Sequence, residues 1–166
     1  MPELFAPILF LHVLGAIVAL GPSFAFPMIG AMGGREPRHA NFATRLTHLL
    51  STRLVDPLIL STAVTGVGLI RARSIPVLAQ SYRWLLLSIA VYVAAFAFSW
   101  FVQRPTILRV IELTAEPRPA PALASPSGPP PELMRAVARS RRNGLVLALL
   151  SLALVFLMVV KPSLPL

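Results

Sequence analysis

The chain contains no cysteine, which excludes a disulfide framework, a thiolate metal site and a cysteine nucleophile. Charged residues are also scarce: they make up 13% of the 166 residues, against about a quarter in soluble domains. The sequence shows no phosphate-binding loop, no nucleophile triad and no His/Glu zinc pattern. The scarcity of charge argues against a soluble enzyme. The missing motifs give no support to an enzyme of another kind.

Hydrophobic residues, by contrast, make up 56% of the chain and are concentrated in long runs. Because about 20 apolar residues cross the hydrocarbon core, we predict membrane spans over residues 4–32, 41–70, 82–103 and 144–160. A backbone in lipid must satisfy its own hydrogen bonds, so each span is expected to be an α-helix. The predicted fold is an all-α integral membrane protein, a single domain over residues 1–166 built as an antiparallel four-helix bundle.

Prolines mark the expected breaks between and within these spans. Pro22 and Pro27 should bend the first span or end it early, and Pro57 should kink the second. Gln103-Arg104-Pro105 should end the third span, with a short surface helix after it. Residues 116–131 include seven prolines among Ala and Ser, a composition typical of an extended or disordered linker.

The basic residues predict how the spans are oriented. The net charge of +9 comes from fourteen arginines and one lysine against six acids. Most of them flank the loop after the first span or the proline-rich linker: Arg35, Arg38, Arg45, Arg53, Arg104, Arg109, Arg118, Arg135, Arg139, Arg141 and Arg142. The opposite side has only Arg71, Arg73, Arg83 and Lys161. The positive-inside rule then predicts a cytoplasmic linker with both termini on the outer side. We expect a bacterial inner-membrane protein, so this outer side would be the periplasmic side.

The basic residues also suggest a partner. They flank apolar runs, so we expect anionic lipid headgroups rather than nucleic acid. The cluster just before the last span is the strongest candidate anchor: Arg135, Arg139, Arg141 and Arg142.

His12 is the sharpest candidate for chemistry, because it lies inside a run that has no charged residue. An intramembrane histidine can be a haem or metal ligand or a proton relay. Alternatively, it is a structural residue that forms a hydrogen bond to Thr65, Ser88 or Tyr92, which should lie at a similar depth. Ser88 and Tyr92 are therefore the residues expected beside any cofactor at His12.

A second polar group lies in the first half of the second span. Asp56 is the only acid in a predicted span; Arg45 and His48 share its helical stripe, and Arg53 lies on an adjacent face. We favour a structural ion pair at Asp56 near the cytoplasmic interface, with His48 as an interfacial cap. The alternative is a proton or cation site that uses the carbonyl freed by Pro57. Since His48 should lie about 20–25 Å from the level of His12, the two histidines cannot share one haem.

The segment Leu11-His12-Val13-Leu14-Gly15, followed by small and apolar residues to Gly21, resembles a family pattern. The chain looks most like an uncharacterised family of predicted integral membrane proteins, a domain of unknown function (DUF2269-like). It is distantly similar to four-helix membrane proteins of the protoporphyrinogen-oxidase and copper-resistance-D type. That resemblance implies a haem b ligand role for His12. Where those proteins carry a tryptophan and a lysine, this chain has Ala19 and Ser88.

Three functions remain open at this point. The favoured prediction is a non-enzymatic accessory or assembly subunit, bound to other membrane subunits or to copies of itself. The scarcity of polar groups and the small-residue helix faces support it. The second is a b-type haem redox protein with His12 as axial ligand. The third is a small transporter that uses Asp56 and His48.

Overall fold

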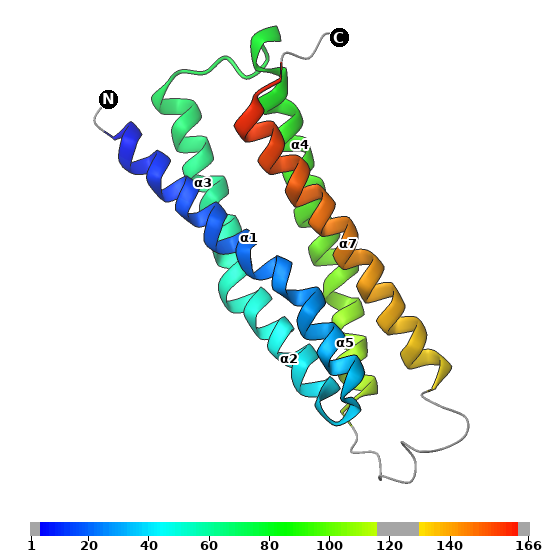
Figure 1. Ribbon diagram of the computed structural model, residues 1–166. Helices are drawn as coiled ribbons and strands as arrows, with labels where there is room; N and C mark the ends of the chain where they lie inside the picture. The colour runs from blue at the N-terminus through cyan, green and yellow to red at the C-terminus, as the bar shows by residue number, and fades with distance from the viewer. Residues whose placement is uncertain (1–3, 116–129, 163–166) are drawn as a thin grey trace.

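The computed structural model describes residues 4–115 and 130–162, and its long elements are all α-helical (Figure 1). Four helices are long and apolar enough to cross a membrane: Phe5–Arg35, Ala40–Ala72, Gln80–Leu113 and Pro131–Val160. They alternate in direction, so the described chain begins and ends at the same end of the bundle. The predicted all-α, antiparallel four-helix membrane fold is confirmed. The predicted linker over 116–131 lies almost entirely outside the described residues.

The first span is a single helix, α1 (Phe5–Arg35), and the last is a single helix, α7 (Pro131–Val160). A short 3-10 turn, Pro37–His39, joins α1 to the second span. We call this end of the bundle the loop end, and the opposite end, where α1 begins and α7 stops, the terminal end.

The two middle spans share one plan, in which a π-helical turn of five residues separates two α-helices. The second span consists of α2 (Ala40–Leu50), the turn Ser51–Val55 and α3 (Asp56–Ala72). The third consists of a 3-10 turn (Gln80–Tyr82), α4 (Arg83–Phe98), the turn Ser99–Gln103 and α5 (Arg104–Leu113).

These π turns explain why the third span does not end where we predicted. In the turn before Pro105, the Arg104 N–H donates to the Ser99 carbonyl, five residues back. Pro105 then occupies the first turn of α5, a position that tolerates proline. The predicted break at Gln103-Arg104-Pro105 is therefore wrong. Nor does α1 end early, since it continues through Pro22 and Pro27 to Arg35.

At the terminal end the helices form two pairs, α1 with α3 and α4 with α7 (Figure 1). A cation–π contact joins each pair: Arg73 lies 4.0 Å from the Phe5 ring centroid, and Lys161 lies 5.6 Å from that of Trp84. Toward the loop end, α1 packs on α2, α2 on α5, and α5 on α7. The four spans are thus more tightly joined at the loop end than at the terminal end.

Small residues allow the closest helix contacts. A Cβ atom on Gly15 would lie 3.0 Å from the Thr62 Cγ2 atom, so α1 and α3 approach there as nearly as side chains permit. Ala19, one turn on, is 1% exposed. Yet only 11% of the most apolar window of each span is buried in the described fold. Most of the apolar surface is thus available to lipid or to other helices.

Candidate functional site: two polar centres between the spans

His12 connects the first span to the second. Its Nδ1 atom lies 3.0 Å from the Thr62 carbonyl oxygen and 3.1 Å from Thr65 Oγ1. A carbonyl can only accept, so Nδ1 carries the proton and Nε2 carries the lone pair. Thr65 Oγ1 in turn donates to the Ser61 carbonyl at 2.9 Å, which leaves it free to accept from the imidazole.

Gly66 provides the space for the imidazole of His12. A Cβ atom at Gly66 would lie 3.3 Å from His12 Cε1, so the ring lies against the backbone of α3. Of the three residues expected near His12, the structure places Thr65 in contact with it. Ser88, fully buried, instead donates to the Trp84 carbonyl at 2.7 Å, and the Tyr92 hydroxyl donates to the Ile59 carbonyl at 2.8 Å. Neither hydroxyl donates to His12, although Tyr92 also interacts with Thr62.

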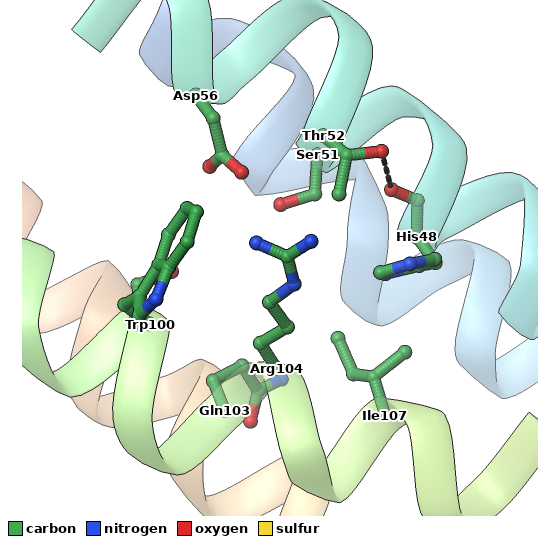
Figure 2. A pocket seen from close by; sticks show the side chains of 9 residues that line it. His48, Ser51, Thr52, Asp56, Trp100, Gln103, Arg104 and Ile107 are labelled. Atoms are coloured by element: carbon green, nitrogen blue, oxygen red, sulfur yellow. Dashed lines mark hydrogen bonds between the residues drawn. The ribbon is translucent and has the colours of Figure 1, made fainter. Parts of the chain in front are cut away.

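The second polar centre is a cavity of about 20 Å³ between the second and third spans (Figure 2). Across it the side chains of Asp56 and Arg104 point toward each other. The lining residues come from both π turns and the helices beside them: His48, Ser51, Thr52, Asp56, Ser99, Trp100, Gln103, Arg104 and Ile107. We call this group the Asp56–Arg104 cavity.

The cation that faces Asp56 is Arg104, which the sequence pattern did not predict to lie beside it. Arg45 and Arg53 are both exposed, whereas Arg104 interacts electrostatically with Asp56 and His48. Asp56 is absent from the salt bridges within 4 Å that form in the described part of the chain. The predicted close ion pair at Asp56 is thus not found.

A sequence signal for this pairing does exist. Ser51 precedes Asp56-Pro57 by five residues, and Ser99 precedes Arg104-Pro105 by the same number. Both serines and both charged residues line the cavity. The same pattern therefore occurs in both walls of the cavity. It consists of a serine, four further residues, a charged residue and a proline.

Neighbouring contacts orient the cavity side chains. The Arg104 guanidinium lies over the Trp100 ring, 4.3 Å from its centroid. Gln103 Nε2 donates to the Ser140 carbonyl of α7 at 3.4 Å. Its Oε1 atom, by contrast, is a buried side-chain acceptor with no hydrogen-bond partner among the described residues.

Neither centre resembles a metal site. Within residues 4–115 and 130–162, no three His, Asp or Glu side chains gather closely enough to hold an ion. For haem, His12 supplies one imidazole. Thr62, which contacts His12, lies fourteen residues beyond His48 on the second span, about 21 Å at 1.5 Å per residue. A haem with His12 and His48 of one chain as its two ligands therefore does not fit.

The surface beside His12 contains a groove of about 290 Å³ between α1 and α3. Apolar side chains dominate its lining, with Gly15 and two hydroxyl residues among them: Leu11, Leu14, Gly15, Val18, Leu58, Ser61 and Thr65. We call it the α1–α3 groove.

Comparison with protein-family models identifies a match over residues 7–162 to the family described as "Predicted integral membrane protein (DUF2269)". The chain belongs to this family. His12, the α1–α3 groove and the Asp56–Arg104 cavity all lie within the matched segment of this DUF2269 protein. No curated protein and no solved structure matches the chain. The resemblance to this family is confirmed, and the more distant one to protoporphyrinogen-oxidase and copper-resistance-D proteins stays a prediction.

Proposed function

We propose that this DUF2269 protein is a non-enzymatic accessory subunit of a bacterial inner-membrane complex, and that a transmembrane helix of a partner subunit binds in the α1–α3 groove. The groove itself carries the proposal. Lipid tails are as apolar as leucine, so helices in a membrane associate through close packing on small residues and through hydrogen bonds. Ser61 is a small residue that also has a hydroxyl group in the groove, and the leucine side chains offer packing surface.

The low burial of the spans supports the same function. Large apolar side chains beside or within the groove are well exposed, among them Leu11 at 53% and Leu14 at 42%. A partner helix would cover this surface and make the close contacts that lipid chains cannot maintain.

The absence of native cysteine makes the proposal directly testable by crosslinking. Leu14→Cys places a thiol in the groove, and Leu87→Cys on α4 is a matched control, since both leucines are 42% exposed. In native membranes treated with a cleavable thiol crosslinker, Leu14→Cys should give a discrete adduct several-fold stronger than Leu87→Cys. An adduct with a second, different subunit supports the proposal, and one of twice the chain mass shows that a copy of the chain occupies the groove instead. Equal, diffuse labelling of both variants would contradict any docking there.

A second function, haem binding, is favoured by one observation. The Nδ1–H bond to the Thr62 carbonyl fixes the imidazole and leaves Nε2 with its lone pair, as is usual for histidines that bind a metal. His12 would supply one axial ligand, and any second ligand would come from a partner subunit. The test is an absorption spectrum of protein purified in mild detergent, oxidised and then reduced with dithionite. A Soret band that is lost in His12→Ala supports haem, and a colourless, folded protein counts against it.

The orientation is also part of the proposal. The excess of arginine at the loop end supports a cytoplasmic loop end and periplasmic termini. On α7 the arginines available to anionic headgroups are all exposed: Arg135, Arg139, Arg141 and Arg142. With a membrane-impermeant thiol reagent on spheroplasts, Ser74→Cys should react and Gly34→Cys should not; the reverse pattern would invert the topology.

A further inference from the structure

The Asp56–Arg104 cavity has a size and chemistry that the accessory function does not use. Its volume, about 20 Å³, is enough for one water molecule, which needs about 10–15 Å³ and two or more polar partners. Gln103, whose Oε1 atom is buried without a protein donor, is among the lining residues, and Ser51 and Ser99 add hydroxyl groups to the lining. The cavity can therefore hold a water molecule or a protonated acid beside polar side chains.

Asp56 in this cavity is not locked in an ion pair. No salt bridge within 4 Å involves its carboxylate in the described fold, and the Arg104 guanidinium is held over the Trp100 ring. A carboxylate clamped by a guanidinium would stay ionised, whereas one that shares a polar cavity can exchange between the charged and neutral forms.

The two π turns also leave backbone carbonyls without their usual hydrogen-bond donors. The Asp56 N–H donates to the Ser51 carbonyl, and Pro57 has no N–H, so the carbonyls of Thr52 and Arg53 lose their usual α-helical donors. In the turn before Pro105, the carbonyls of Trp100 and Phe101 lose their usual α-helical donors in the same way. Single π turns of this kind are frequent at functional sites.

We infer that Asp56 is a proton-binding site within the membrane, with Arg104 and His48 as the groups that set its affinity. A proton from water at the loop end adds to a carboxylate oxygen, and the neutral acid can then donate a hydrogen bond inside the cavity. His48 of α2 and Arg104 of α5 are the titratable groups that interact with Asp56. Between His12 and Arg35, α1 has no titratable side chain, and α7 packs near Gln103 through Ser140.

Two features of the sequence provide single-site probes. Asp56 is the only aspartate of the chain, so protein labelled with carboxyl-¹³C aspartate reports on this group alone. Trp100 lines the cavity and is one of two tryptophans, so Trp84→Phe leaves it as the sole indole. Protonation of Asp56 changes the field on the Arg104 guanidinium over that ring, and the emission of Trp100 should follow.

The experiment titrates both probes in lipid nanodiscs between about pH 4 and 9, the range over which buried carboxyls titrate. We expect the ¹³C signal and the Trp100 emission of the folded protein to change with one common midpoint. The emission step should be lost in Asp56→Asn and shifted in His48→Gln. His39→Gln, in the exposed turn beside Glu36, is the control and should leave the midpoint unchanged.

The proposal fails if Asp56 stays ionised throughout this range while the protein is folded, or if the Trp100 step persists in Asp56→Asn. The labelled protein has a native cavity, so its ¹³C result stands even if Asp56→Asn does not fold.

Discussion

The two polar centres join the spans in opposite ways. At His12 the imidazole N–H has acceptors on α3 within 3.1 Å. In the Asp56–Arg104 cavity the charges face each other without a close salt bridge, and a glutamine oxygen has no partner among the described residues. The contrast is therefore between a histidine with close hydrogen-bond acceptors on the neighbouring span and a carboxylate that faces a cation across a cavity.

The largest effect on stability is expected from a variant that removes one of the two facing charges of the Asp56–Arg104 cavity. Arg104→Ala leaves Asp56 without the cation that faces it, and we expect a loss of about 2–3 kcal/mol in the free energy of unfolding, somewhat less than for a fully buried pair. The loss should shrink as the pH falls, because protonation removes the uncompensated charge. Unfolding by SDS titration in mixed micelles measures it. The double variant Asp56→Asn/Arg104→Ala should regain most of the stability, and a double variant as unstable as Arg104→Ala would show that packing is responsible.

The next effect concerns the close approach beside His12. Gly15→Val would push the Thr62 side chain, 3.0 Å from the new Cβ, and separate α1 from α3. We expect a loss of about 1–2 kcal/mol, as is usual for overpacking. Gly21→Val on the same helix is the matched control, because nothing lies within 4 Å of its Cβ position. If both variants lose the same stability in the SDS titration, helix propensity rather than packing accounts for the loss.

A smaller effect is expected from a substitution at His12. His12→Ala removes the bonds to Thr62 and Thr65, and interhelical hydrogen bonds in membranes average about 0.6 kcal/mol. We therefore expect a loss of about 1 kcal/mol in the free energy of unfolding, measured by the same SDS titration. A loss as large as that of Arg104→Ala would mean that the contrast between the two centres is wrong.

The smallest effect belongs to the exposed ion pairs at the loop end. Arg109 pairs with Glu112 at 2.6 Å and with Glu132 of α7. These groups are solvent-exposed, so Arg109→Ala should lower the free energy of unfolding less than any of the variants above, and even less at high salt. Thermal unfolding at low and high ionic strength measures this difference, and a large, salt-independent loss would refute it.

The sequence was sufficient to predict the spans, because long apolar runs can cross a bilayer only as helices. It also placed Thr65 among three residues expected near His12, since antiparallel helices of known rise bring these residues to a similar depth, and Thr65 is the one of the three that contacts His12. It did not reveal the role of Arg104. We interpreted the following proline as a helix end, whereas a π turn accommodates that proline, and the 3.6-residue period does not show such turns.

Ser88 and Tyr92 illustrate a different limit. Both lie at the expected depth, yet each donates to a backbone carbonyl, Ser88 within its own helix and Tyr92 on α3. Depth follows from residue number, whereas the direction of a hydroxyl depends on rotation about the helix axis and on local packing.

The pairing of helices at the terminal end bears on how the protein is made. Each pair consists of consecutive spans, α1 with α3 and α4 with α7, and each has its own cation–π contact. During synthesis, the first two spans can leave the translocon and pack as a finished hairpin before the ribosome has translated the last. The contacts between hairpins lie mainly toward the loop end, so assembly can finish there as two preformed units meet.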